Sequence, residues 1–151
     1  IGRFGGPLDS CKGLWEEFGD ARVIDTPISE GAVVGAAVGA ALTGKRPIVD
    51  IMFLEFLPMV LQQLGCDAGA MHYYSDGAAR VPLVVRAKFG VGPFHGHPYD
   101  HHPWAAYTPG VKVAIPFARS LEAMVIPDQD AIVAAARRSV AHRAAARAVD
   151  R

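Results

Sequence analysis

The sequence predicts an α/β fold built on an open, mostly parallel twisted sheet with helices on both faces. Short apolar runs rich in β-branched residues recur along the chain, with helix-length segments between them, which is typical of βαβ units. The runs lie at residues 22–25, 47–52, 81–86 and 111–115. They are almost continuously apolar, which indicates strands covered on both faces, as in a parallel sheet.

The connecting segments predict two helices and one functional loop. Residues 31–42 are small and apolar and stop near Gly44, and a longer helix is expected at 55–74 before the turn at 75–77. Residues 90–103 combine Gly, Pro and His without periodicity. A segment of this length and composition is more often functional than a simple connector.

Length, charge and cysteine content restrict the class of protein. The chain has 151 residues, 51% of them hydrophobic, which is enough for one real core. Fifteen basic residues balance fifteen acidic ones, so no global charge points to a nucleic acid or to a membrane as a partner. The two cysteines have no CxxC spacing, which indicates reduced thiols and a cytoplasmic location.

The carboxyl ends of the predicted strands indicate where a site should lie. Ligands of open parallel sheets bind in the crevice beyond these ends, so the turn after 22–25 and the loop after 81–86 are the best positions. Glu30 follows the first turn. Taken alone, it is equally well explained as a first-turn carboxylate that complements a helix dipole, worth about 0.3–1 kcal/mol.

The loop after 81–86 also has an alternative interpretation as a metal site. It contains His95, His97, His101 and His102 together with Asp100, which are ligands of a type that zinc accepts. Their spacing matches no established zinc pattern, so no metal ligand is assigned.

Four motifs in order resemble the β subunit of thiamine-diphosphate-dependent 2-oxoacid dehydrogenases, a family that includes the pyruvate, branched-chain and acetoin enzymes. The longest is EEFGDARVIDTPISE at residues 16–30. The others are GAALTGKRP at 39–47, VPLVVR at 81–86 and PGVKV at 109–113. The resemblance extends over residues 2–116, and four matches in the same order are far more specific than any one of them.

The resemblance implies a transketolase-type pyrimidine-binding domain that uses thiamine diphosphate. In this family an α subunit holds the diphosphate and its Mg²⁺, and the subunits form an α2β2 heterotetramer. The chain has no Gly-Asp-Gly element of the α-subunit kind, so it is expected to be inactive in isolation. The implied reaction is oxidative decarboxylation or cleavage of a small 2-oxoacid or acetoin, with acyl transfer to a lipoyl-bearing acyltransferase component. The identity of the substrate is not readable.

The TPISE motif and the segment after residue 52 provide the implied cofactor-binding residues. Glu30 would hydrogen-bond to N1′ of the aminopyrimidine and favour the imino tautomer that takes the C2 proton of the thiazolium. Ile28 in the same motif is assigned to cofactor binding. Phe56 corresponds to the aromatic residue that packs against the pyrimidine ring, where a flat apolar surface orients the ring and excludes water.

A histidine of the loop is the second implied catalytic residue. Counted back from the Pro-Gly pair at 109–110, His97 corresponds to the family histidine that stabilises or protonates intermediates near the thiazolium. Gly96 stands where the family has Gln, and His95 lies two positions earlier. We therefore assign His97 and keep His95 as the second candidate.

The resemblance also defines the expected domain organisation. Residues 1–126 form the pyrimidine-binding domain, incomplete at both ends, and residues 127–151 form a divergent Ala/Arg-rich helical tail. The chain is thus expected to be a fragment or a frame-altered product. Two alternatives stay open: a non-catalytic remnant that binds an α-type partner, and a carbon–carbon transferase related to transketolase or deoxyxylulose-phosphate synthase.

Overall fold

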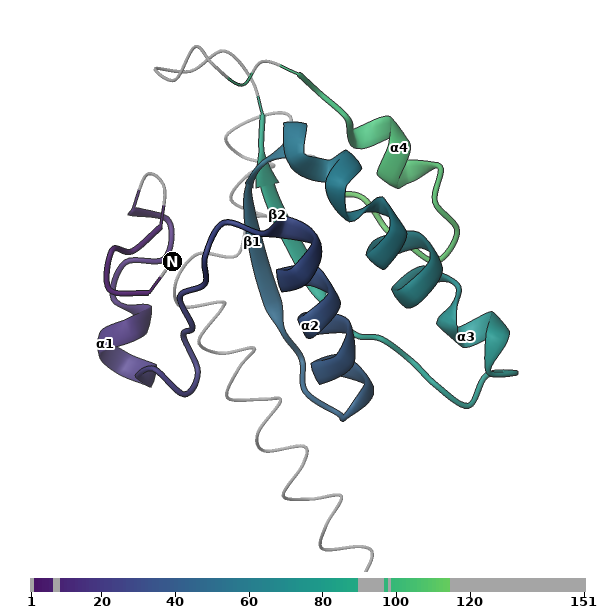
Figure 1. The fold of residues 1–151 in the computed structure, drawn as a ribbon, viewed down its shortest axis with the longest axis horizontal. Coiled ribbons are helices and arrows are strands. Elements are labelled where there is room, and N and C mark those ends of the chain that lie inside the picture. Colours follow the sequence, from purple (N-terminus) through teal and green to yellow (C-terminus); the bar gives the residue numbers. More distant parts are fainter. Residues whose placement is uncertain (1, 7–8, 90–96, 98, 115–151) are drawn as a thin grey trace, which may run out of the picture. The chain divides into compact units, whose positions relative to one another are not determined.

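The structure, a computed structural model, describes residues 2–6, 9–89, 97 and 99–114 (Figure 1). They fall into two compact units, one formed by Val23–Val113 and a smaller one that contains Gly2–Arg22. The predicted helical tail at 127–151 lies outside the described residues. None of the helices in the described part of the chain is long and apolar enough to cross a membrane.

The smaller unit is organised around one short helix, α1 (Leu14–Phe18). The guanidinium carbon of Arg3 lies 4.3 Å from the centre of the Trp15 ring, and the indole N–H of Trp15 donates a hydrogen bond of 2.7 Å to Asp20. These contacts hold residues 2–6 and the segment that follows the helix against the side chain of Trp15.

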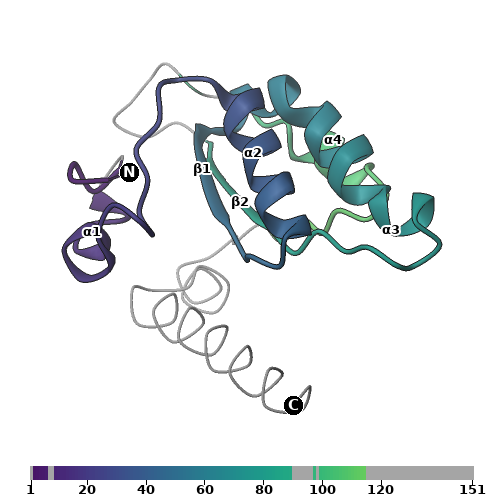
Figure 2. The same cartoon turned by 60° about the horizontal axis from the view of Figure 1, so that its bottom comes forward.

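The larger unit contains a parallel two-stranded sheet in its described part. β1 (Ile48–Phe53) pairs with β2 (Val84–Lys88), with Ile48 beside Val84. Both strands overlap the runs predicted at 47–52 and 81–86, so these predictions and the parallel orientation are confirmed. The described helices of this unit lie on one side of the sheet (Figure 2).

An irregularity near the end of β1 changes the register of the two strands. The register shifts between Asp50 and Phe53, and Met52 adopts a φ of 66°, which is unusual for a residue other than glycine. The N–H of Met52 donates a hydrogen bond of 2.8 Å to the Asp50 carboxylate. This local bond stabilises the irregular backbone from which the next helix begins.

The long helix α2 (Glu30–Leu42) packs along β1 and closes the core, as Figure 2 shows from a second direction. Its buried face carries Val34 and Ala37, which share one cluster with Val49, Leu57 and Val60. Small residues let the helix approach closely: a Cβ at Gly31 would lie 3.3 Å from the Met59 carbonyl oxygen. The helix predicted at 31–42 is confirmed.

The helix predicted at 55–74 is present but is not one regular helix. It consists of a 3₁₀ helix η2 (Leu54–Val60), a π-helical segment η3 (Gln63–Gly69) and a short α-helix α3 (Met71–Tyr74). Pro58 inside η2 has no N–H to donate to the residue four positions earlier, which disfavours regular α-helix there.

Two of the four strand predictions are wrong. Residues 22–25 and 111–114 have no strand structure, and Ile24 is exposed. A β-branched run forms a strand only where a neighbouring strand completes its hydrogen bonds, and the sheet in the described residues provides none beyond β1 and β2. Most of the predicted loop at 90–103 lies outside the described residues, and its end begins helix α4 (His102–Ala106).

The residues after α4 contact the π-helical segment η3, and two glycines form this contact. Gly110 has a φ of 81°, and a Cβ added there would collide with the backbone of Gly69. A Cβ at Gly69 would in turn collide with the Pro109 carbonyl oxygen. The PGVKV motif therefore needs glycine for its backbone conformation and for the close approach to η3.

The first turn of α4 is held by one carboxylate. Asp100 accepts hydrogen bonds from the His102 backbone N–H at 3.0 Å and from the His102 ring Nδ1 at 2.6 Å. Burial by itself raises the pKa of the Asp100 carboxyl group, but these hydrogen bonds and the charges of His102 and His101 together outweigh it and hold the pKa below its ordinary value.

We predict that Gly110→Ala lowers the free energy of unfolding by at least about 2 kcal/mol, because it adds left-handed strain to a backbone collision. Gly39→Ala is the matched control, since a Cβ there meets nothing within 4 Å. It should stabilise α2 by about 0.5–1 kcal/mol. Urea denaturation of the full chain measures both, and a Gly110→Ala chain as stable as the wild type would contradict the contact.

We predict that the Asp100 carboxyl group titrates below the ordinary aspartate value of about 3.9. Its stabilising contribution should be present above about pH 4 and lost as the pH falls through the lowered pKa. A ¹³C NMR titration of the carboxyl carbon measures the midpoint, which should rise in His102→Ala and rise less in His101→Ala. A wild-type midpoint at or above the ordinary value would show that the pairing does not persist in solution.

Candidate functional site

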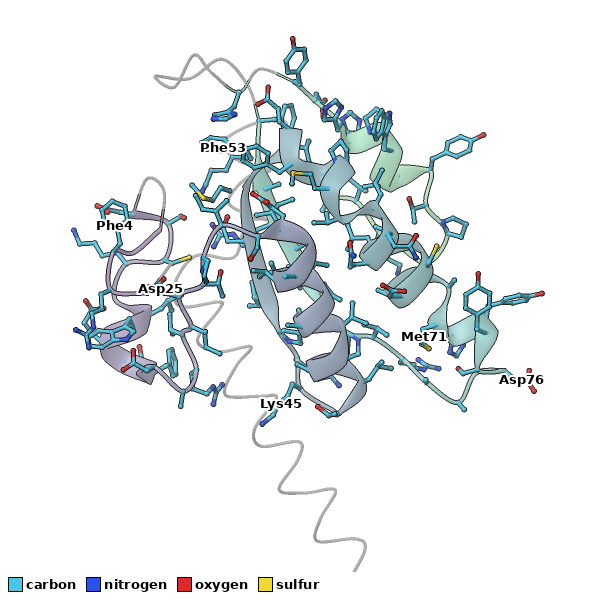
Figure 3. The ribbon with its side chains drawn as sticks, viewed as in Figure 1. Phe4, Asp25, Lys45, Phe53, Met71 and Asp76 are labelled. Carbon is cyan, nitrogen blue, oxygen red and sulfur yellow. The ribbon has the colours of Figure 1, made fainter. Side chains whose placement is uncertain are left out.

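The candidate site lies where β1 ends and η2 begins. The strand passes into the 3₁₀ helix without an intervening loop, since β1 ends at Phe53 and η2 begins at Leu54. Figure 3 labels Phe53 at this end of the strand. The next residues, Glu55 and Phe56, are half-buried. One short stretch thus presents two aromatic rings and a carboxylate at the carboxyl end of the sheet.

His97 is held against this stretch by three side chains. Its ring stacks on Phe53, with centroids 3.8 Å apart and planes 15° apart, and meets Phe56 edge-on at 5.7 Å. Its Nδ1 lies 2.5 Å from the Glu55 carboxylate. The structure therefore brings together Phe56 and His97, which the sequence predicts separately as site residues.

Glu30 is the first residue of α2 and is half-buried. At this position the positive end of the helix dipole favours a carboxylate. Within the described part of the chain the Glu30 side chain makes no hydrogen bond or ion pair. The following residue, Gly31, lies against the Met59 carbonyl of η2, so Glu30 and Phe56 sit on adjoining elements.

The structure gives less support to the two remaining predicted site residues, Ile28 and His95. Ile28 is 87% exposed in the turn before α2, and its assignment to cofactor binding stays a prediction. His95 lies outside the described residues. The sequence predicts a site at the turn after residues 22–25, but these residues do not form a strand. The parallel strands whose carboxyl ends define the candidate site are β1 and β2.

Phe53 and Glu55 are the site residues that the sequence does not reveal. Glu55 is 42 positions from His97, and no local periodicity connects residues so far apart. The available signal is the FLEF sequence directly after an apolar strand, because a polar residue between aromatic residues at a strand end points to the ligand edge of a parallel sheet.

The alternative interpretation as a metal site has no support in the described residues. His102 is paired with Asp100, and the His101 ring stacks between Tyr99 and Trp104. No group of three or more potential ligands in the described ranges could hold a metal ion.

The sequence of the chain is similar to those of known dehydrogenase subunits. The pyruvate dehydrogenase E1 component subunit beta of Ascaris suum is 36% identical over 139 residues, which cover 88% of this chain and 38% of that protein. The 2-oxoisovalerate dehydrogenase subunit beta of Bacillus subtilis is 35% identical over 140 residues, 88% of this chain and 42% of that protein. The chain thus spans about two fifths of the length of these relatives.

A shorter and more similar match supports the same assignment. The pyruvate dehydrogenase E1 component subunit beta of Chaetosphaeridium globosum is 45% identical over 92 residues, 61% of this chain and 28% of that protein. The resemblance to 2-oxoacid dehydrogenase β subunits is therefore confirmed, as is the α/β fold class. Residues 4–125, a range that includes Glu30, Phe56 and His97, match the pyrimidine-binding domain of transketolase, and the chain belongs to that family.

Proposed function

We propose that the chain supplies the pyrimidine-binding half of a thiamine-diphosphate-dependent 2-oxoacid dehydrogenase. The observation that carries this proposal is the contact of Phe56 with His97 beside the helix that begins at Glu30. These residues come from separate segments, and the family resemblance assigns each of them to the same site. The contact of Phe56 with His97 supports one shared chemical role for them.

The residues present fit the aminopyrimidine of the cofactor. A half-buried carboxylate without a partner among the described residues, Glu30, suits a weakly basic ring nitrogen that shares a proton. The ring of Phe56 offers a flat apolar surface of the kind that packs against an aromatic heterocycle. When bound, thiamine diphosphate supplies the carbanion-stabilising centre needed to cleave the bond next to a 2-oxo carbon.

Each side chain then has a separate task. Glu30 holds a proton at the pyrimidine nitrogen N1′, and Phe56 orients the ring and excludes water from it. His97 moves a proton near the reacting carbon, a task that suits an imidazole because its ordinary pKa is close to neutrality.

The family resemblance assigns the diphosphate and Mg²⁺ to a partner, and this sequence contains no Gly-Asp-Gly element of the kind that would hold them. We propose an α-type subunit that holds both and assembles with this chain as an α2β2 heterotetramer in the cytoplasm. The substrate is a small 2-oxoacid or acetoin, and the acyl group passes to a lipoyl-bearing acyltransferase component. The isolated chain is then inactive.

We predict that Glu30→Gln lowers 2-oxoacid oxidation by the complex reconstituted with an α-type subunit at least about 100-fold, because the amide cannot share the pyrimidine proton. Dye-linked oxidation measures the rate. Glu16→Gln, which changes an exposed carboxylate on α1, is the matched control and should leave the rate unchanged.

Two outcomes would contradict the proposal in different ways. Unchanged turnover in Glu30→Gln would remove Glu30 from the site. A wild-type complex that assembles with the α-type subunit but oxidises no 2-oxoacid or acetoin would favour a non-catalytic, partner-binding role.

A further inference from the structure

Every ring contact and side-chain hydrogen bond of His97 in the described structure comes from one stretch, residues 53–56. Phe53 stacks on one face of the imidazole, Phe56 meets it edge-on, and Glu55 binds Nδ1. The family assignment gives roles to His97 and Phe56 but none to Glu55. We propose that Glu55 is a positioning residue that fixes the tautomer and the ring orientation of His97.

The chemistry of the pair determines which ring nitrogen carries the proton. An ionised carboxylate only accepts hydrogen bonds, so Nδ1 of His97 must donate to Glu55. The two atoms are in hydrogen-bond contact at 2.5 Å, and a hydrogen bond to an ionised acceptor is stronger than one between neutral groups. In the neutral ring, Nε2 is then the nitrogen without a proton, which can accept one.

The same carboxylate also holds the backbone next to the histidine. Its second oxygen accepts a hydrogen bond of 3.4 Å from the Tyr99 N–H. Stacking on Phe53 alone would permit a 180° flip of the ring about its Cβ–Cγ bond, which exchanges Nδ1 with Cδ2 and Nε2 with Cε1. Two bonds from one carboxylate, one to the ring and one to the backbone, remove this freedom.

A second histidine–carboxylate pair shows what is special about this one. His102 and Asp100 also bond through Nδ1, at 2.6 Å, but they are two residues apart, and both side chains are 34% exposed. Glu55 is 15% exposed and joins two segments 42 positions apart. The local pair stabilises a helix start, whereas the Glu55 pair fixes a side chain that reaches the site from another segment.

The catalytic consequence of this inference rests on the proposed function. If His97 transfers a proton near the reacting carbon, Glu55 selects Nε2 as the nitrogen that does so. A histidine whose partner carboxylate sets the tautomer is a recurring catalytic arrangement.

The direct test is ¹⁵N NMR of the full chain with labelled histidine at pH 8, where an ordinary imidazole is neutral. The His97 signals are identified by their loss in His97→Gln. We expect a single tautomer with the proton on Nδ1 in the wild type. We expect the same tautomer in Glu55→Gln, whose amide oxygen can still accept, and a mixture of tautomers in Glu55→Ala.

The signals of His102 provide the internal control and should be the same in the wild type, Glu55→Gln and Glu55→Ala. A wild-type His97 with its proton on Nε2 would overturn the proposal, even if Glu55→Ala does not fold. So would a folded Glu55→Ala chain with the wild-type tautomer.

Activity of the reconstituted complex gives a second readout. We expect Glu55→Ala to lower kcat about 10–100-fold, as the loss of a supporting side chain typically does, and Glu55→Gln to retain more activity than Glu55→Ala. Equal kcat values in wild type and Glu55→Ala would remove the catalytic consequence. A wild-type complex without activity would contradict the proposed function, while the tautomer measurement would still decide the role of Glu55.

Discussion

The packing of α2 against β1 and η2 is the interaction on which the described site depends. Val34 of α2 and Val60 of η2 are both fully buried in this cluster, and burying a side chain of this size contributes about 1.5–3 kcal/mol. Because the glycine after Glu30 contacts the backbone of η2, the same packing sets Glu30 beside the helix that carries Phe56. Core and site therefore share one interface.

The direct passage from strand to helix provides the second constraint. The Asp50 side chain is 1% exposed and lies 3.8 Å from Arg86 and 3.9 Å from Lys88 of β2, while its other oxygen binds the Met52 N–H. The two cations at these distances offset part of the desolvation cost of the buried carboxylate. The carboxylate also stabilises the backbone irregularity that directs residues 53–56 toward His97.

Most of the regular helices and strands could be predicted from the sequence, but the irregular backbone between them could not. Helix α2 and strands β1 and β2 were predictable because small or β-branched residues predominate in them, whereas 22–25 also contains such residues and forms no strand, since the described residues provide no neighbouring strand for it. Motif resemblance predicts Glu30, Phe56 and His97 individually as site residues. The Glu55–His97 bond was not predictable, because tertiary folding alone brings together residues 42 positions apart.

We propose that the start of α2 and residues 53–56 together bind the pyrimidine of thiamine diphosphate. A crystal structure of the chain with an α-type subunit and the cofactor tests it most directly. We predict that the aminopyrimidine ring lies against Phe56, with N1′ within about 3.2 Å of a Glu30 carboxylate oxygen. A cofactor whose pyrimidine lies away from Phe56, with N1′ bonded to another group, would contradict it.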